Sequence, residues 1–450
     1  MKNIAAFIGI TLLSTGMYAQ GWSEMGIGLA GLNANGQILS LQGDNTGKLY
    51  VAGAFVFSGA RNVYAWGTTH WEQVGAMNAD LWYASMCKDA ADNIYTGGSF
   101  SNTSGYRYVA KWNGTAWSQL GVSGGALNAN DIIWKVAANA AGNIFAAGDF
   151  TNAAGYTYVA RWSGASWTEL GAGSGALNGN NTIQAICADA AGNVYAGGAF
   201  TEAGQYYVAM WSPITNAWTR ISPYLNGPVN AMCTDADGYV YVAGAFQNSA
   251  GYNYVGKWDG AFWSELSTGL YQSGNIWTIA AGRNGQLFAA GIFTPYTGLQ
   301  QVYYWDGTTW GQMGTDALLN ANSSIFTLYA DTLNNQVYAA GNFTNAAGRY
   351  YVAKCAMPPA PSPAGVAHTS AISVPSVYPN PADDRLTIDV AAWRVQDASV
   401  TVSDMAGRVL ISDSWSGSVY TISTARLPQG VYVAQITSGS HIYTTRFVRR

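Results

Sequence analysis

Histidine, the residue used most often in metal centres and in acid–base catalysis, is scarce in this 450-residue chain. The three histidines are His70, His368 and His441, and only His70 lies in the long repetitive segment described below. A metal centre built from several histidines is therefore excluded there, and we expect no metal and no cofactor. Residues 235–238, Asp-Ala-Asp-Gly, are similar to part of a calcium loop but lack its other ligands, which favours a turn.

Paired carboxylates are the remaining route to catalysis, because glycoside hydrolysis needs two of them roughly 5 to 10 Å apart. Most acidic residues of residues 20–356 have simpler roles. They begin turns or follow a tryptophan in an outer strand, as do Asp44, Asp189, Asp235, Asp331, Glu72, Glu169 and Glu265. Asp149 is the exception, since it stands where other copies of a repeated motif have uncharged residues. We predict no catalytic residue. Asp149 is a candidate binding residue, and it is the first suspect if the protein is an enzyme.

A repeated Gly-x-Phe motif organises residues 20–356. Its phenylalanines lie 45 to 50 residues apart, at Phe55, Phe100, Phe150, Phe200, Phe246, Phe293 and Phe343. Each copy also contains a preceding apolar run, a Tyr-Val-Ala-x-Trp run and a Trp-x-x-Leu-Gly run. Asp-x-x-Gly and Asn-Gly pairs between them suit tight turns. Each copy is therefore predicted to form four short antiparallel strands.

The two ends of this segment complement each other. The last copy stops at residues 351–355 and lacks its Trp-x-x-Leu-Gly strand, while residues 22–26, Trp-Ser-Glu-Met-Gly, supply an orphan one. A ring would pair them and remove two exposed strand edges. We predict an all-β fold in which residues 20–356 form a seven-bladed β-propeller closed by its N-terminal strand. A parallel β-helix is the alternative.

The repeat resembles the kelch-like propeller repeats. The best match is Tyr-Ala-Gly-Gly at 195–198, followed by the Trp-bearing segment 211–218, although only 97–98 and 197–198 are true Gly pairs. The resemblance implies the propeller architecture and says little about function. The oxidases among the kelch relatives need a histidine-bearing copper site, so their activity is not carried over.

Two sets of side chains are candidates for ligand binding. One position of the innermost strand, here called the variable position, differs between copies and is not dictated by repeat packing: Leu39, Ala84, Trp134, Gln184, Asn230, Trp277 and Phe326. The loop entering that strand carries asparagines, among them Asn128, Asn178 and Asn320. Amides and aromatic faces suit neutral glycans, although asparagine in turns commonly caps its own backbone. The thirteen tryptophans at fixed repeat positions are explained by packing between blades.

The first residues predict export. Residues 1–19 form a signal peptide, with Lys2 ahead of an apolar run and cleavage before Gln20, and the run is too short to span a membrane. No other such run exists, so we expect no transmembrane segment in the mature chain. The net charge of −4 offers no surface for nucleic acid. We expect the cysteines to be unpaired, with a Cys187–Cys233 bridge as the alternative, the full set being Cys87, Cys187, Cys233 and Cys355.

A different segment follows the repeats. Residues 357–373 are predicted to form a proline-rich linker. Residues 374–450 alternate apolar and polar residues, which predicts a small Ig-like β-sandwich. The segment contains a series of short motifs, whose residues are Tyr378, Pro379, Asn380, Pro381, Asp404, Gly407, Arg408, Leu427, Gly430, Tyr432 and Arg446. With these motifs in this order, the segment resembles the sorting domain of type IX secretion cargo of Bacteroidota. The resemblance implies that residues 374–450 engage the secretion machinery and deliver the protein to the medium or to the outer-membrane surface of a Gram-negative bacterium.

These observations favour a secreted or surface-displayed, non-catalytic propeller that binds glycan or protein at one face rich in asparagine and aromatic residues. A polysaccharide hydrolase or lyase with carboxylates at the propeller mouth is the first alternative. A structural component of a surface layer is the second.

Overall fold

The computed structural model describes residues 21–56, 61–171, 173–266, 270, 274–293, 298–314, 317–359, 376–379, 381–390, 397–404, 408–438 and 441–450. The predicted signal peptide and most of the predicted linker lie outside these residues. The all-β prediction is confirmed, because the described chain consists of strands and turns with three short 3-10 turns: η1 (Gly28–Ala30), η2 (Ser123–Gly125) and η3 (Gly173–Gly175). The chain divides into two compact units, Met1–Pro361 and Ser362–Arg450.

The described residues of the first unit form seven four-stranded antiparallel sheets and one small hairpin. The first three sheets contain β2 (Ile38–Gly43), β3 (Leu49–Gly53), β4 (Tyr64–Trp66) and β5 (Trp71–Gln73); β6 (Tyr83–Lys88), β7 (Ile94–Gly98), β8 (Ala110–Trp112) and β9 (Trp117–Gln119); β10 (Ile133–Ala138), β11 (Ile144–Gly148), β12 (Ala160–Trp162) and β13 (Trp167–Glu169). The next three contain β14 (Ile183–Ala188), β15 (Val194–Gly198), β18 (Ala209–Ser212) and β19 (Ala217–Arg220); β20 (Val229–Thr234), β21 (Val240–Gly244), β22 (Gly256–Trp258) and β23 (Trp263–Glu265); β24 (Gly274–Ala281), β25 (Leu287–Phe293), β26 (Tyr303–Trp305) and β27 (Trp310–Gln312). The last contains β28 (Ile325–Asp331), β29 (Gln336–Gly341), β30 (Ala353–Ala356) and β1 (Ser23–Glu24), and the hairpin contains β16 (Thr201–Glu202) and β17 (Gln205–Tyr206).

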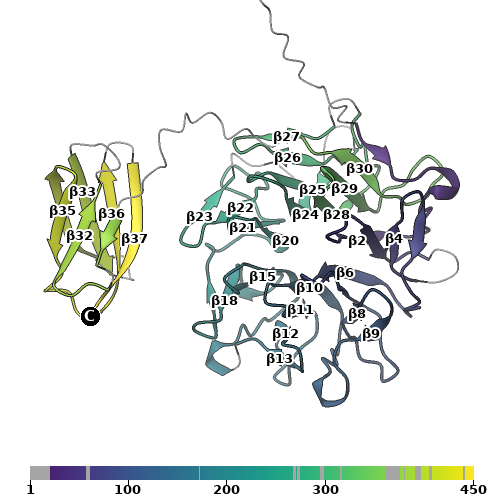
Figure 1. Cartoon of the computed structure of the whole chain (residues 1–450), viewed down its shortest axis with the longest axis horizontal. Helices are drawn as coiled ribbons and strands as arrows, with labels where there is room; N and C mark the ends of the chain where they lie inside the picture. The colour runs from purple at the N-terminus through teal and green to yellow at the C-terminus, as the bar shows by residue number, and fades with distance from the viewer. Residues whose placement is uncertain are drawn as a thin grey trace, which may run out of the picture. The chain divides into compact units, whose positions relative to one another are not determined.

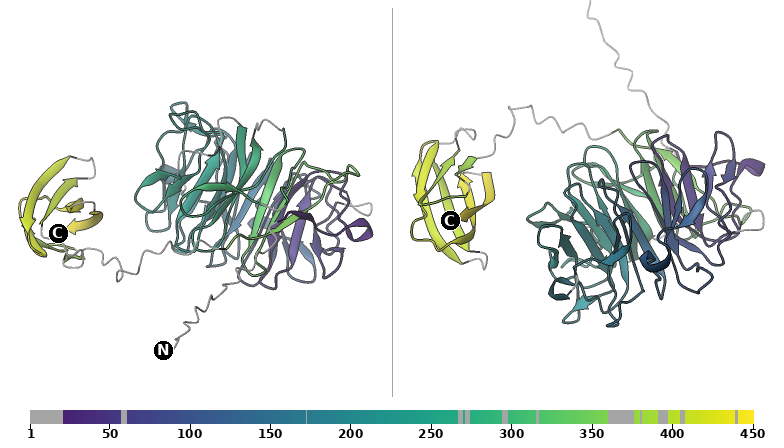
Figure 2. Two further views of the ribbon diagram at one scale, coloured as in Figure 1. Left: turned by 90° about the horizontal axis from the view of Figure 1, so that it is seen from above. Right: turned by 60° about the horizontal axis from the view of Figure 1, so that its bottom comes forward.

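The sheets are arranged around a common axis as in a β-propeller, and each sheet places one of its two end strands innermost (Figure 1). The innermost strands contact one another in the order β2, β6, β10, β14, β20, β24 and β28, and β28 in turn contacts β2. Figure 2 shows the same unit from two further directions, with the sheets side by side as twisted layers. Each sheet therefore contributes one strand to the wall of the axis.

Residues near the N-terminus lie in the same sheet as the last repeat. Ser23 pairs with Lys354 and Glu24 pairs with Ala353. Trp22 is buried in the core of this sheet, and its Nε1 donates a hydrogen bond to the carbonyl of Met313 at 3.2 Å. Residues far apart in sequence thus form one sheet and one core.

The Gly-x-Phe motif builds the core between sheets. All seven phenylalanines are almost completely buried. Phe150 packs edge-on against Tyr158 of the Tyr-Val-Ala run, with ring centroids 5.0 Å apart, and equivalent pairs recur around the ring. Such edge-to-face pairs add to the energy of apolar burial. The motif phenylalanine and the tyrosine of the Tyr-Val-Ala run thus form the same core contact in each of these copies.

The predicted turns are confirmed. Gly192 N donates to the carbonyl of Asp189 at 3.1 Å, as a β-turn requires, and Asp189 also accepts hydrogen bonds from Asn193 and from the hydroxyl of Tyr195. The aspartate therefore closes the turn and fixes the next strand. Asp44, Asp89 and Asp235 do the same in their own copies.

Cys87, Cys187 and Cys233 are free thiols, so the alternative Cys187–Cys233 bridge is not formed in this structure. Cys87, Cys187 and Cys355 are buried, and Cys233 is half-buried. Burial raises the pKa of the Cys87 and Cys187 thiols well above the ordinary range, which makes them poor nucleophiles.

The second unit contains two antiparallel sheets around its own core. One is formed by β31 (Ser376–Tyr378), β32 (Arg385–Asp389) and β35 (Val419–Ser423), and the other by β34 (Val409–Ser416), β33 (Asp397–Asp404), β36 (Gly430–Ser438) and β37 (His441–Arg449). Apolar residues from both sheets, such as Leu386, Val400 and Phe447, share one buried cluster. The unit is therefore a small two-sheet domain.

Candidate binding site

Each innermost strand of the propeller contains a β-bulge at the same place. In β10, Ile133 pairs with Gly148 and Lys135 pairs with Ala147, so that Trp134 is an extra residue without a partner across the sheet. The other six innermost strands show the same register shift. A bulge bends its strand and redirects its side chains. The extra residue is in every case the variable position of the sequence.

The glycine of the Gly-x-Phe motif makes this bulge sterically feasible. A Cβ atom on Gly148 would lie 2.0 Å from the carbonyl oxygen of Ile132, far inside van der Waals contact. The equivalent glycines of the other six copies would meet a carbonyl oxygen at 2.0 to 2.3 Å. Only glycine allows so close an approach of two backbones. The constant glycine of the motif therefore makes room for the bulge that carries the variable position.

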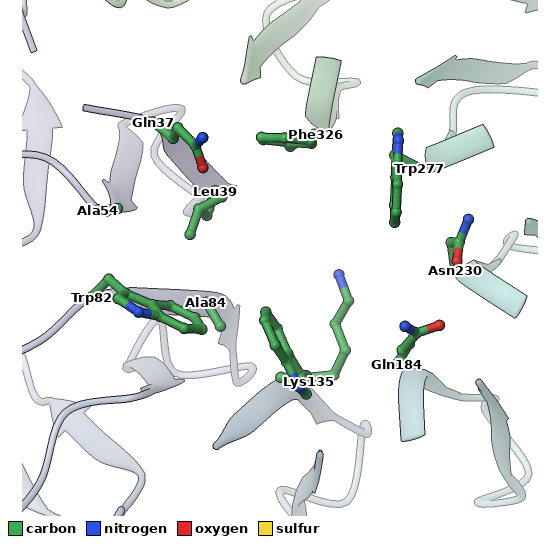
Figure 3. Close-up of a pocket in the computed structure, with 11 residues that line it drawn as sticks. Gln37, Leu39, Ala54, Trp82, Ala84, Lys135, Gln184, Asn230, Trp277 and Phe326 are labelled. Carbon is green, nitrogen blue, oxygen red and sulfur yellow. The ribbon is translucent and has the colours of Figure 1, made fainter. Parts of the chain in front are cut away.

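The variable positions converge on one cavity of about 460 Å³ at the propeller axis (Figure 3). We call this cavity the axial pocket. It is lined by Leu39, Ala84, Trp134, Gln184, Asn230, Trp277 and Phe326, together with Gln37, Ala54, Trp82 and Lys135. Among the residues predicted for binding, Trp134, Gln184, Asn230, Trp277 and Phe326 are thus brought together from five different sheets, whereas Asn128, Asn178, Asn320 and Asp149 do not line the pocket.

Aromatic rings form two groups in the axial pocket. Trp82 and Trp134 lie with ring centroids 5.1 Å apart and planes inclined at 40°. Trp277 and Phe326 meet edge to face, with centroids 6.3 Å apart. All four side chains are half-buried, so that part of each ring faces the cavity. Flat apolar faces of this kind stack against the apolar face of a ligand.

Amide groups occupy the other part of the lining. Asn230 is buried, and its Nδ2 donates to the carbonyl of Ile276 at 3.1 Å, which fixes its amide. Oε1 of Gln184 is buried and accepts no hydrogen bond from any residue that the structure describes. An unsatisfied buried acceptor costs free energy, which a donor on a bound ligand would recover.

Lys135 provides the only ionisable side chain among the residues that line the axial pocket. Figure 3 shows its side chain extended, with the amino nitrogen pointing toward the middle of the cavity. Within the described residues, Lys135 has neither an ion pair nor a side-chain hydrogen bond. Burial lowers the pKa of its ammonium group below the ordinary lysine value.

Asp149 supports Trp134 and lies beside the pocket lining. Nε1 of Trp134 donates to Oδ2 of Asp149 at 2.7 Å, and the hydroxyl of Thr182 donates to Oδ1. Both carboxylate oxygens are therefore engaged. Because these bonds fix the indole, the unusual aspartate in the motif is explained as a residue that orients Trp134.

Asn128, Asn178 and Asn320 are exposed and do not line the axial pocket. Each has a positive φ of 48° to 49°, a turn conformation that asparagine tolerates better than most residues. The second asparagine of the same loop has a clear structural role. Oδ1 of Asn130 accepts from the backbone of Thr151 at 2.8 Å, and Asn180 and Asn322 bind Thr201 and Thr344 in the same way. The loops at this face are thus held together by their own amides.

Several residues of the C-terminal motif stabilise the second unit. Asp404 accepts two hydrogen bonds from Arg408, one from the backbone N at 2.9 Å and one from Nε at 3.1 Å. Leu427 and Tyr432 are buried, and the hydroxyl of Tyr432 donates to the carbonyl of Pro428 at 2.7 Å.

The other motif residues are placed as follows. Tyr378 is about half exposed at the end of β31, Pro379 and Pro381 follow it, Gly430 begins β36, and Arg446 lies in β37 opposite Val433. Asn380, Gly407 and the Arg446 side chain lie outside the part of the chain that is described.

The described residues contain neither a candidate metal site nor a candidate membrane-spanning helix. No group of three or more His, Cys, Asp or Glu side chains is placed to hold a metal ion in the described part of the chain. No helix among the described residues is long and apolar enough to cross a membrane.

Comparison with known proteins identifies the C-terminal unit. Residues 376–450 match the secretion system C-terminal sorting domain family. This domain is the sorting tail of type IX secretion, so the chain is an exported protein of the cell surface or the medium, and its tail interacts with that machinery. Among curated proteins, none matches the chain.

Solved structures resemble the first unit. YCF48 bound to D1 peptide is 14% identical, with a TM-score of 0.50 over 75% of this chain and 97% of that one. YCF48 from Cyanidioschyzon merolae is 13% identical, with a TM-score of 0.49 over 75% and 99%. The WD40 β-propeller domain of Doa1 is 12% identical, with a TM-score of 0.49 over 74% and 97%. At 14% identity, the likeness to YCF48 bound to D1 peptide shows a shared fold alone.

Sequence reasoning missed three of the polar and aromatic lining residues. Lys135 follows the variable position, where the other copies have small side chains, and this contrast was a usable signal. Trp82 and Gln37 lie two residues before the variable position, where the copies also differ. Neither their orientation nor the bulge could be read from the alternation of residues alone.

Proposed function

We propose that this protein is an exported, non-catalytic binding protein that holds a glycan in the axial pocket. The observation that carries the proposal is the convergence of the seven bulged residues on one cavity, where aromatic faces and amides are combined. Repeat packing requires none of these side chains, and sugars are bound by stacking on aromatic rings and by hydrogen bonds to amides.

The architecture behind this proposal is a seven-bladed, kelch-like propeller over residues 20–356, closed by residues 22–26. It is supported by the pairing of Ser23 with Lys354 and by the cyclic contacts of the innermost strands. A closed ring makes the axis a single enclosed site to which every blade contributes.

The remaining parts serve export. We propose a signal peptide at 1–19, a linker at 357–373 and an Ig-like sorting domain at 374–450, in a member of the Bacteroidota. The hydrogen bond from Tyr432 to the carbonyl four residues upstream is similar to the tyrosine corner of Ig-like sandwiches and supports that part.

A peptide is the alternative occupant. One fold neighbour, YCF48, has been solved with D1 peptide bound, so propellers of this general shape accommodate a peptide. The axial pocket favours a compact, hydroxyl-rich ligand, because its polar groups are distributed around the wall.

The enzyme alternative has less support. Asp149 engages both oxygens in hydrogen bonds, and no carboxylate lies among the lining residues of the axial pocket. A hydrolase with two carboxylates would therefore have to act elsewhere. A purely structural surface-layer role leaves the unsatisfied amide of Gln184 and the polar lining without purpose.

A glycan array probed with the full-length chain tests the proposal. Wild type should bind one group of glycans, and Trp134→Ala combined with Trp277→Ala should abolish that binding, while the matched exposed control Tyr156→Ala should not. Incubation with the same polysaccharides should leave them uncleaved. Binding that survives the double substitution would place the site outside the axial pocket, and cleavage abolished by Asp149→Asn would establish the enzyme.

A further inference from the structure

Lys135 occupies a position that has a structural role in other sheets. The equivalent residues are small: Ser40, Ser85, Ala185, Ala231, Thr278 and Thr327. Where a hydroxyl is present, it can link neighbouring innermost strands, since Met86 N donates to Ser40 Oγ at 2.9 Å and Leu328 N donates to Thr278 Oγ1 at 3.1 Å. Lysine is not needed for this link, and its four-carbon chain reaches the cavity instead.

The cation at Lys135 is unfavourable in the free protein. Its amino group points into a confined cavity whose nearest walls are aromatic and amide side chains (Figure 3). Lys135 is half-buried, and a partly desolvated charge without a partner costs free energy and is often found at a functional site. Asp149, the carboxylate that orients Trp134, already accepts hydrogen bonds from Trp134 and Thr182. The missing partner is therefore expected from a ligand.

We propose that the axial pocket selects an acidic sugar, a uronic acid, and that Lys135 binds its carboxylate. This inference rests on the proposed function, because it names the class of glycan that the same pocket takes. The sugar ring stacks against an indole, its carboxylate pairs with the Lys135 ammonium, and one hydroxyl donates to Oε1 of Gln184. Among the described residues, the Lys135 ammonium and Oε1 of Gln184 have no hydrogen-bonding partner of their own.

Charge and shape both favour a uronic acid over other anions. The lining offers a single cation, which matches a singly charged carboxylate, whereas a phosphate ester carries a charge of about −1.5 to −2. A peptide carboxylate sits on a flexible apolar stem and brings no hydroxyl to Gln184. A uronic acid presents a rigid ring with an apolar face and hydroxyls around its edge, as the lining requires.

The test compares uronate oligosaccharides with their carboxyl-reduced, neutral counterparts, measured by calorimetry on the full-length chain. We expect wild type to bind the acidic member of a pair about tenfold more tightly, equivalent to about 1.4 kcal/mol. Lys135→Gln should remove this preference by weakening binding of the acidic member. Lys135→Arg should retain the preference. Lys354→Gln, which removes an exposed lysine of β30, is the matched control and should behave as wild type.

The outcomes separate this inference from the proposed function. Equal binding of acidic and neutral members, or a preference that survives in Lys135→Gln, would overturn the uronic acid and leave a glycan-binding pocket in place. Failure of every saccharide to bind, with peptides bound instead, would overturn both. Should Lys135→Gln fail to fold, the wild-type comparison and Lys135→Arg still decide the matter.

Discussion

The outer and inner strands of each propeller sheet use repetition in opposite ways. In the outer strands, tryptophan recurs at fixed positions, and its indole N–H repeatedly bonds a carbonyl of the neighbouring sheet. Trp71 donates to Met25 and Trp167 donates to Leu120 in this manner. In the innermost strands, the bulged residue changes from sheet to sheet while its backbone geometry stays the same. The constant tryptophans therefore join neighbouring sheets, and the variable bulged residues line the axis.

The largest expected effect concerns the outer part of the ring. Trp22 is about as buried as Trp71, with exposed fractions of 9% and 5%, although it comes from the segment before the first repeat. If residues 22–26 complete the last sheet, Trp22→Ala should destabilise the protein by about 3–5 kcal/mol, as removal of a buried tryptophan does.

Chemical denaturation of Trp22→Ala and Trp71→Ala in parallel measures this. Equal losses would mean that the closing strand is as integral as an internal one. A loss at Trp22 of less than a third of that at Trp71 would contradict closure by the N-terminal strand.

The next effect concerns the support of the inner strand. Gly148→Ala places a methyl group 2.0 Å from the carbonyl of Ile132, so either the bulge or its partner strand must move. We expect the free energy of unfolding to fall by about 1–3 kcal/mol and the axial pocket to bind its ligand with lower affinity. Gly124→Ala is the control, because nothing lies within 4 Å of the added Cβ. Similar melting temperatures for the two variants would show that the bulge does not need glycine.

The fold was largely predictable because the same short motifs recur in each copy, which makes a weak local pattern recognisable. The Gly-x-Phe motif, the Asp-led turns and the orphan strand at residues 22–26 each indicated an element that the structure contains. The bulge was not predictable, since alternation of apolar and polar residues does not reveal an extra residue in a strand. The recurring glycine was its only trace, because a glycine in a strand interior marks close backbone approach.

A smaller effect distinguishes structural from functional residues within the inner strands. Ser40→Ala leaves the backbone N–H of Met86 buried without its acceptor, and we expect a loss of about 1–2 kcal/mol with ligand binding unchanged. Ser118→Ala, at an exposed serine of β9, should cost almost nothing. Reduced affinity in Ser40→Ala at unchanged stability would reverse the assignment of this position to packing.

The candidate site was predictable in part. The variable position was identifiable as a column that packing does not dictate, and its residues do meet in the axial pocket. The asparagines of the entering loops were a weaker inference, because the same residue type serves turns and ligands, and here Asn130 binds Thr151. Lys135 was missed because its neighbour Trp134 held the variable position, and a bulge changes which side chains face the axis.

The smallest expected effect on stability concerns the charge of Lys135 in the axial pocket. Because burial lowers the folded-state pKa of Lys135 below its ordinary value of 10.5, the unfolded chain binds more protons between the two pKa values. The stability of wild type relative to Lys135→Met should therefore rise with pH through the alkaline range up to 10.5, by on the order of 1 kcal/mol. Subtracting the variant removes the titration of the buried tyrosines, which both proteins share. A bound uronate should flatten this slope, since a carboxylate beside the ammonium raises its pKa again. A slope that stays the same with and without saturating uronate would mean that the ligand does not reach Lys135.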